Sequence, residues 1–296
     1  MSRLLEGVYV ALVTPFAADG SVAIDAVEGL AHEMFDAGVA GIVALGSTGE
    51  AAALEADEQQ AVIDACSRVC AARNGQLIVG AGTNNTAKTI AATQRLDGVA
   101  AITAALIVVP YYVRPSEAGI VAHFRAVADA SPVPLVLYNI PVRTGRNLGP
   151  AGMLELAQHP NIVGVKQAVN ALDAETLQIL AAAPADFSVL GGDDPFFFPT
   201  VLMGGAGAIS AAAHLCTERF VAMIECGLAG KVEDGRAHAE VLLDVAQKGF
   251  AEPNPAVFKG VLHAQGRIPT PDVRLPLVNA SDDAVQRALD AVARAS

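Results

Sequence analysis

The feature that most constrains the fold is the alternation of short apolar runs with longer segments of helical period. Eight runs are rich in Val, Ile and Leu, as expected of parallel strands that are covered on both faces. The runs are Val8–Phe16, Gly41–Gly46, Leu77–Gly82, Leu106–Pro110, Leu135–Ile140, Ile162–Ala168, Phe187–Gly192 and Ala206–Ala211. Eight strands alternating with helices predict an α/β fold of the (β/α)8 TIM-barrel type. A doubly wound open sheet is the alternative, but no G-x-G-x-x-G motif follows the first run.

Helical segments fill the intervals between the runs and continue after the last one. Those between runs are Asp25–Ala37, Glu55–Arg73, Thr86–Leu96, Ser116–Ala130, Pro150–His159, Asp173–Ala183 and a shorter Pro195–Met203. Those after the eighth run are Thr217–Ala229, Lys231–Lys248, Ala256–Gln265 and Ser281–Ala295. We therefore expect a barrel catalytic domain at residues 1–225 and a C-terminal helical extension at residues 226–296.

Composition excludes some classes of function. The formal net charge of −12 argues against nucleic acid and against an anionic membrane surface as partners. The longest uncharged run, Gly98–Val113, is shorter than the roughly 18 residues of a membrane helix, and the N-terminus lacks the pattern of a signal peptide. None of the four cysteines forms a C-x-x-C pair, as expected of reduced thiols. We expect a soluble, cytoplasmic protein.

Lys166 is the only one of the five lysines within a strand-like run. Alternation along that run puts Val163 and Val165 on the helix-facing side, and Lys166 inside the barrel with Gly164 leaving room beneath it. Active sites of such barrels lie at the C-terminal ends of the strands. Burial penalises the ammonium and favours the neutral amine that Schiff-base chemistry needs. A lysine that merely pairs with a carboxylate is the alternative.

Tyr138 ends the fifth run, and Lys166 ends the sixth. Adjacent strands lie about 4.8 Å apart, so the phenol should reach the lysine or its substrate. A tyrosine in that position could relay protons during imine formation and carbon–carbon bond chemistry. Without the neighbouring lysine, a tyrosine whose hydroxyl finds a structural partner would be the better interpretation.

Gly46-Ser47-Thr48-Gly49-Glu50 follows the second run. Its glycines permit a tight turn with exposed amides, and its two hydroxyls add donors, which suits a carboxylate ligand. Phosphate is the alternative, although the loop lacks the lysine of a P-loop. Arg143, after the fifth run, could hold a second carboxylate in bidentate fashion or could be an ordinary surface residue.

Other chemistries have weaker signals. Gly191-Gly192-Asp193-Asp194 ends the seventh run, where many barrels bind phosphate, but two adjacent acids would repel one. The six histidines are scattered without ligand spacing, so we expect no metal site. No G-x-S-x-G nucleophile elbow is present.

Together these motifs resemble the dihydrodipicolinate synthase / N-acetylneuraminate lyase family of pyruvate-dependent class I aldolases. The resemblance covers nearly the whole chain. Further matching segments are Ala11–Phe16, Pro110–Tyr112, Arg114–Ser116, Tyr138–Gly145, Val163–Lys166, Gly204–Ser210, Glu252–Pro255 and Arg274–Leu277. The family implies a lyase in which Lys166 forms an imine with pyruvate, so no cofactor is needed.

The resemblance also implies roles for individual residues. Tyr138 would shuttle protons in a relay with Ser47 and with Tyr112, which would reach into a neighbouring subunit's site. Ser47 and Thr48 would bind the pyruvate carboxylate. Members of the family are commonly homotetramers, built as dimers of dimers.

Arg143-Thr144-Gly145 resembles the synthases, which use that arginine for the carboxylate of L-aspartate 4-semialdehyde. Gly192 and Ile209 would line the pocket through backbone groups. We therefore expect condensation of pyruvate with that semialdehyde, a step of lysine and diaminopimelate biosynthesis.

Departures from the synthase pattern keep alternatives open. The loop has Ser47 where synthases usually have threonine, and Gln167 where they usually have an acid. A related aldolase or dehydratase for a sugar acid or another 2-oxo acid, similar to N-acetylneuraminate lyase, is one alternative. A non-catalytic barrel that binds a small acid is the other. Ala56, Gln59 and Lys88 match the family's lysine-feedback site poorly, which predicts weak or absent lysine inhibition.

Overall fold

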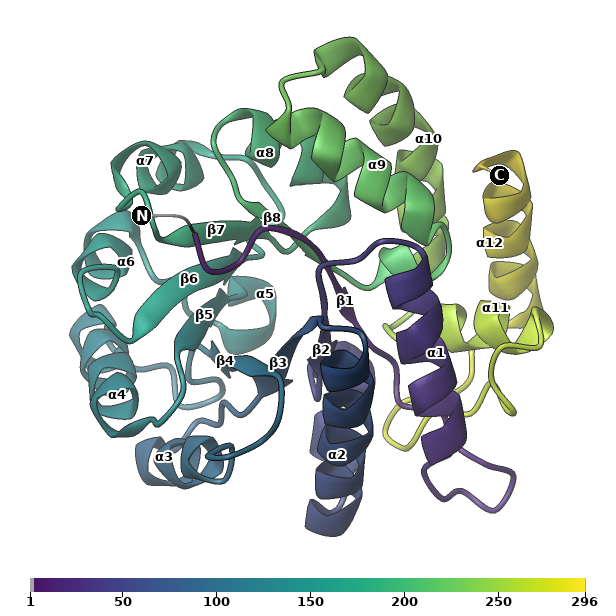
Figure 1. Cartoon of the computed structure of the whole chain (residues 1–296), viewed down its shortest axis with the longest axis horizontal. Helices are drawn as coiled ribbons and strands as arrows, with labels where there is room; N and C mark the ends of the chain where they lie inside the picture. Colours follow the sequence, from purple (N-terminus) through teal and green to yellow (C-terminus); the bar gives the residue numbers. More distant parts are fainter. Residues whose placement is uncertain (1–2, 296) are drawn as a thin grey trace.

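The computed structural model describes residues 3–295. Eight parallel strands form a closed barrel in the order β1 to β8, with β8 pairing to β1 (Figure 1). The strands are β1 (Gly7–Ala11), β2 (Gly41–Ala44), β3 (Gln76–Gly80), β4 (Ile102–Val108), β5 (Leu135–Asn139), β6 (Ile162–Gln167), β7 (Ser188–Gly191) and β8 (Gly207–Ser210). The predicted TIM barrel is therefore confirmed, and the open-sheet alternative is excluded.

Helices surround the barrel and continue beyond it (Figure 1). Those between strands are α1 (Ile24–Asp36), α2 (Ala56–Ala72), α3 (Thr86–Gln94), α4 (Glu117–Ala130), α5 (Pro141–Thr144), α6 (Pro150–Leu156), α7 (Ala174–Ala182) and α8 (Phe197–Leu202). Those after β8 are α9 (Thr217–Leu228), α10 (Val232–Gly249), α11 (Ala256–Ala264) and α12 (Asp282–Ala295). Among the described residues, no helix is both long and apolar enough to cross a membrane.

The predicted runs agree with the strands in number and order but overshoot their ends. The run Val8–Phe16, for example, contains a strand only to Ala11, because the chain then turns into the loop that precedes α1. Short 3-10 helices at Ser47–Gly49 (η1), Ala51–Ala53 (η2), Asp194–Phe196 (η3) and Ala212–His214 (η4) follow strands and were not expected. Turns of this length carry no periodicity that a sequence window could detect.

The proposed boundary between residues 225 and 226 falls inside α9, the helix that follows β8. Helix α10 packs on α9, and α11 and α12 pack on α10 and on each other (Figure 1). The division into a barrel and a helical extension stays a prediction, and a boundary after α9 would keep that helix whole.

Two apolar clusters account for the core. One fills the barrel interior and includes Tyr9, Ile78, Val136 and Ile209. The other lies between the strands and the helices and includes Val10, Leu137 and Val165. Side chains therefore alternate between the two clusters along the strands, as the period-two pattern predicts, except in β6.

The expected face of Val163 was wrong. Val165 packs in the outer cluster as predicted, but Val163 packs against the barrel interior. The pairing of β5 with β6 steps from Leu135↔Ile162 to Val136↔Gly164, so Val163 is an extra residue in the ladder. Such a bulge reverses the face of the residues before it.

Candidate active site

Lys166 and Tyr138 lie side by side at the C-terminal ends of β6 and β5. They are direct partners in the register of the two strands. The Lys166 Nζ lies 4.7 Å from the centre of the Tyr138 ring, and each residue is only 8% exposed. The predicted juxtaposition is therefore present, with an amine held against a phenol in a largely dry environment.

Gly192 provides the room for the Lys166 side chain. A Cβ at Gly192 would lie 2.6 Å from Ala168 Cβ and 3.1 Å from Lys166 Cγ, so a larger residue would displace the lysine. The expected role of Gly164 was wrong in this respect. A Cβ there would meet the Ser188 carbonyl of β7 at 2.5 Å, so Gly164 permits close approach of the strands.

Ser47, Thr48, Gly49 and Glu50, together the carboxylate loop, follow β2 as the turn η1. Thr14 Oγ1 donates to the Gly49 carbonyl at 2.7 Å, and Asn254 Nδ2 donates to Thr48 Oγ1 at 2.9 Å. Ser47 is exposed, whereas Thr48 is buried. The loop is thus anchored from two sides, with one hydroxyl free at the surface of a cavity.

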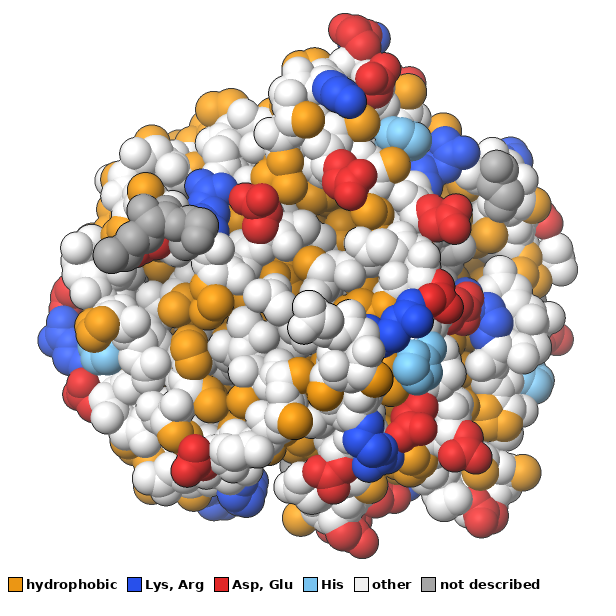
Figure 2. Space-filling view, in the orientation of Figure 1, with side chains coloured by type: hydrophobic (Ala, Val, Ile, Leu, Met, Phe, Trp, Pro, Cys, Tyr) orange, Lys and Arg blue, Asp and Glu red, His pale blue; other side chains and the backbone are white. Residues whose placement is uncertain are grey.

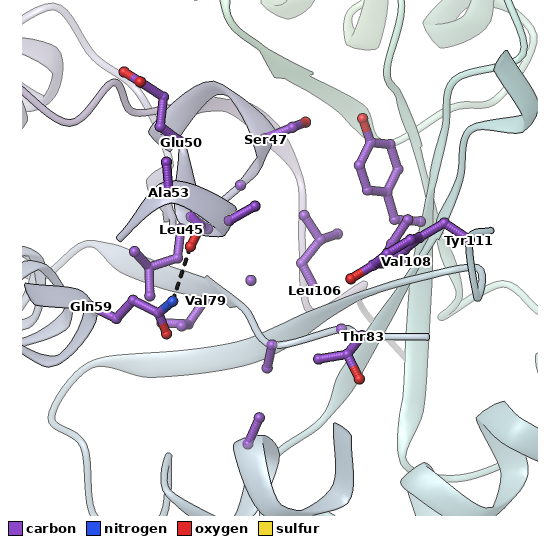
Figure 3. Close-up of a pocket in the computed structure, with 18 of the residues that line it drawn as sticks. Leu45, Ser47, Glu50, Ala53, Gln59, Val79, Thr83, Leu106, Val108 and Tyr111 are labelled. Carbon is purple, nitrogen blue, oxygen red and sulfur yellow. Dashed lines mark hydrogen bonds between the residues drawn. The ribbon is translucent and has the colours of Figure 1, made fainter. Parts of the chain in front are cut away.

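That cavity has a volume of about 890 Å³, and Ser47, Tyr138, Arg143 and Tyr111 all line it. Figure 3 shows Ser47 and Tyr111 at its margin, with Gln59 and Val79 toward α2 and β3. It therefore brings together three of the predicted site residues from β2, β5 and α5. Lys166, Thr48, Gly192 and Ile209 are outside its lining, although Ile209 lies fully buried in the barrel interior.

Arg143 lies on α5, a single turn held by a buried amide network. Asn139 Nδ2 donates to Gln167 Oε1 at 3.1 Å and to Asn147 Oδ1 at 2.9 Å. Asn139 Oδ1 accepts from the Leu148 amide at 3.1 Å. The Asn139 side chain thus joins β5, β6 and the segment after α5. Arg143, on α5, is exposed and lines the cavity.

Tyr112 does not reach the cavity within this chain. Its side chain is 88% exposed, and its φ of 69° lies in the left-handed region. Tyr111, the residue before it, lines the cavity instead. Any part that Tyr112 plays in a relay with Tyr138 therefore needs another chain.

Asp193 and Asp194 were considered only as a reason against phosphate, but the charge of Lys166 acts on both carboxyl groups. Burial raises the pKa of Asp194 to about 6, against the opposing effects of its hydrogen bond from Ser210 and of the Lys166 charge. Burial also raises the pKa of Asp193, and Lys166 again opposes this. The signal was available, because strand seven lies beside strand six in any barrel of this order.

A second missed feature is an ion pair between Glu50 and Lys259. Lys259 Nζ lies 2.8 Å from Glu50 Oε1, and the two side chains are 0% and 1% exposed. Sequence reasoning had no means of pairing residues that lie 209 positions apart. A lysine within the apolar segment Ala256–Ala264 was the available hint.

Two further findings bear on the chemistry. Within residues 3–295, no group of three His, Cys, Asp or Glu side chains is arranged to hold a metal ion. Figure 2 shows apolar and uncharged side chains over the left and centre of the face in view, with basic and acidic side chains close together to the right of the centre.

Comparison with known proteins gives a consistent result. A family model for the dihydrodipicolinate synthetase family matches residues 4–295. The 4-hydroxy-tetrahydrodipicolinate synthase of Moorella thermoacetica is 40% identical over 92% of this chain and 91% of its own length. That of Thermosynechococcus vestitus is 39% identical over 95% and 94% of the two chains.

Solved structures agree. A dihydrodipicolinate synthase from Cyanidioschyzon merolae with lysine bound superposes with a TM-score of 0.94 at 34% identity, covering 99% of each chain. The enzyme from Thermotoga maritima superposes with a TM-score of 0.94 at 29% identity, also covering 99% of each. The resemblance drawn from the strand-end motifs is confirmed: this chain belongs to the dihydrodipicolinate synthetase family.

Proposed function

We propose that this enzyme condenses pyruvate with L-aspartate 4-semialdehyde to give 4-hydroxy-tetrahydrodipicolinate. The observation that carries the proposal is the buried Lys166 amine against the Tyr138 ring, 4.7 Å from its centre. Relatives that match more than nine-tenths of the chain are 4-hydroxy-tetrahydrodipicolinate synthases, which supports the synthase over a sugar-acid lyase. Location in the cytoplasm is part of the proposal, in keeping with four free cysteines.

In this reaction Lys166 is the group that bonds covalently to substrate, and the atoms balance without a cofactor. Lys166 Nζ attacks C2 of pyruvate, and loss of water leaves a protonated imine. Loss of a methyl proton gives an enamine, which attacks the aldehyde carbon and forms the new carbon–carbon bond. The amino group of the second substrate then attacks the imine carbon and releases Lys166. One water leaves per turnover, and no cofactor takes part.

Neighbouring residues supply positioning and proton transfer in this scheme. The Tyr138 hydroxyl relays protons at the imine carbon and at the new alkoxide, together with Ser47. The hydroxyls and amides of Ser47 and Thr48 take the pyruvate carboxylate. Gly192 and Ile209 contribute backbone groups close to the imine.

Arg143 is placed for the second substrate. Its exposed side chain lines the cavity, where the guanidinium can hold the carboxylate of the semialdehyde by a bidentate contact. The carboxylate loop would then hold the carboxylate of pyruvate, and Arg143 would hold that of the semialdehyde.

We also propose that the enzyme works as a homotetramer, a dimer of dimers, in which Tyr112 completes the relay of a neighbouring subunit. Its 88% exposure supports a contact outside its own chain. The fold alone does not impose this assembly, since one structural neighbour is a monomeric dihydrodipicolinate synthase variant. Sedimentation velocity at assay concentrations tests it, and an active monomer would refute the role of Tyr112.

The proposed activity is tested by following NADPH oxidation with added dihydrodipicolinate reductase, pyruvate and L-aspartate 4-semialdehyde. Turnover that depends on both substrates is expected. Borohydride treatment with pyruvate should add a reduced adduct to Lys166, located by peptide mass spectrometry. An adduct without turnover would preserve the imine chemistry and refute the second substrate, and no adduct would refute both.

A further inference from the structure

The ion pair between Glu50 and Lys259 lies directly behind the carboxylate loop. Glu50 is the last residue of that loop and has a left-handed φ of 52°. Both oxygens of its carboxylate are occupied: Oε1 accepts from Lys259 Nζ at 2.8 Å, and Oε2 accepts from the Arg274 amide at 2.8 Å. The end of the loop is therefore held by α11 and by the segment that follows it.

Aromatic and polar contacts extend this attachment. The Phe16 ring lies 3.9 Å from Lys259 Nζ and 4.5 Å from Arg274 Cζ, and Thr270 Oγ1 donates to the Phe16 carbonyl at 2.8 Å. Arg274 also bonds Glu58 on α2 through two contacts of 2.5 Å. The charges thus form one continuous group between the barrel and the C-terminal helices.

Burying an ion pair has a high free-energy cost compared with joining two elements by apolar packing. Two charges that are removed from water lose hydration that their attraction barely offsets, and well-packed apolar residues are often as stabilising. A left-handed backbone at a residue other than glycine adds to the cost. We therefore attribute a positioning role to the pair. Both oxygens of the Glu50 carboxylate are held by hydrogen bonds, which specifies the position of the loop in a way that apolar packing does not.

Charge gives a second reason for the pairing. Glu50 lies two residues after Thr48, in a loop whose proposed ligand is itself a carboxylate. An uncompensated anion at that distance would repel the substrate. Figure 3 shows the Glu50 carboxylate directed away from the side of the cavity on which Ser47 lies. Lys259 neutralises it there, while Asn254 from the same C-terminal region donates to Thr48 Oγ1.

We propose that Glu50 and Lys259 are positioning residues that hold the carboxylate loop in the shape that binds the carboxylate of the 2-oxo acid. The inference rests on the proposed function and adds to it that the C-terminal helices help to determine pyruvate affinity. Neither residue takes part in proton transfer or contacts the second substrate. Their loss should therefore alter saturation by pyruvate and leave saturation by the semialdehyde nearly unchanged.

The test is the pyruvate concentration that gives half-maximal borohydride trapping on Lys166, in the full chain. Lys259→Met should raise it about tenfold or more, because the loop loses its anchor and Glu50 loses its counter-charge. Lys248→Met is the matched control, since it removes an exposed lysine of α10 that lies 3.8 Å from Asp244. This control should saturate like the wild type. Lys259→Arg, which keeps the charge, should recover part of the loss.

Glu50→Gln combined with Lys259→Met separates positioning from charge and from folding. The double variant has no unpaired buried charge, so it should fold cooperatively, as thermal unfolding will show. Half-saturation by pyruvate should remain several-fold above the wild type, with an unchanged KM for the semialdehyde. A folded double variant that saturates like the wild type would overturn the inference. Failure of the wild type itself to trap pyruvate would instead refute the proposed function.

Discussion

Carboxyl groups on the two sides of the barrel mouth lie in opposite electrostatic environments. Beside β2, Glu50 is paired with Lys259 and Glu58 with Arg274, whose hydrogen bonds hold the pKa of Glu58 down to about 2. Beside β7, Asp194 has one hydroxyl partner, Ser210, and burial raises its pKa to about 6. Paired charges hold a shape, whereas an incompletely compensated carboxyl stays responsive to charge that appears at the reacting group.

The largest expected effect is that of replacing Lys166, on the same side of the barrel mouth as Asp194. Lys166→Ala should reduce turnover by on the order of 10³-fold or more, since no other lysine within residues 3–295 ends a barrel strand to form the imine. The fold should survive, because the backbone pairing of β6 with β5 and β7 does not depend on the Lys166 side chain. Coupled turnover and the circular dichroism spectrum check both statements, with the exposed Lys231→Ala as control. Appreciable residual turnover would argue against an imine at this position.

A sharper test of the comparison applies the same chemical change, carboxylate to amide, on each side. Glu58→Gln should destabilise the protein at pH 7.5 by about 0.5–1.5 kcal/mol, because solvent screens part of the attraction between Glu58 and Arg274. The folded pKa of Glu58 lies below its unfolded value of about 4.3, so its stabilisation is present above that value and declines as the pH falls toward 2. Asp194→Asn should instead stabilise the protein at pH 7.5 by about 1–3 kcal/mol, because its folded pKa lies above the unfolded value of about 3.9.

The pH windows of the two substitutions differ as well. The gain from Asp194→Asn should disappear as the pH falls from 6 to 4, whereas the loss from Glu58→Gln should diminish only below about 4. Urea unfolding across this range measures both. Effects of the same sign at pH 7.5 would break the distinction between the two sides.

A smaller effect is expected at the exposed end of the cavity. Arg143→Ala should raise the KM for the semialdehyde about tenfold, the amount expected from a lost charge-assisted contact, and leave pyruvate saturation unchanged. Initial rates with each substrate varied in turn provide the measurement. Arg125→Ala is a suitable control, because that arginine pairs with Glu155 on the outer helices. Impaired pyruvate saturation would reassign Arg143 to the first substrate.

The smallest expected effect is that of free lysine. Ala56 and Gln59 line the part of the cavity beside α2, where neither side chain carries a negative charge to attract an ammonium group, and Lys88 on α3 carries a like charge. Inhibition should therefore be weak or absent when lysine is titrated into the coupled assay. Half-maximal inhibition below about 1 mM would contradict this, since that constant already corresponds to about 4 kcal/mol of binding.

The parts of the fold and site that could be predicted from sequence are those that depend on periodicity and strand order. Alternation placed Lys166 inside the barrel, and the order of the strands put Tyr138 beside it, as the register shows. Val163 was misplaced, because an extra residue in a strand changes the face without changing the composition of the run. The roles assigned to Ser47, Thr48 and Arg143 stay predictions until substrates are titrated.

Other parts depended on contacts that no local pattern encodes. The Glu50–Lys259 pair joins the second strand to α11, and the significance of either residue is visible only when both are placed. Asp193 and Asp194 were considered only as groups that would repel phosphate. Burial raises the pKa of both, and the charge of Lys166 on the adjacent strand opposes this. Electrostatic environment is a property of the closed barrel, so it could not be obtained from spacing alone.

The long separation in sequence between Glu50 and its partners determines when the carboxylate loop can be anchored during synthesis of the chain. A ribosome adds about 5–20 residues per second, so the 209 positions from Glu50 to Lys259 take about 10–40 s. The carboxylate loop is made early, yet its anchors at Lys259 and Arg274 are among the later residues to emerge. A nascent chain that has completed all eight strands still lacks them. Competence to bind substrate should therefore arise late in synthesis, only after the chain has been made through Arg274.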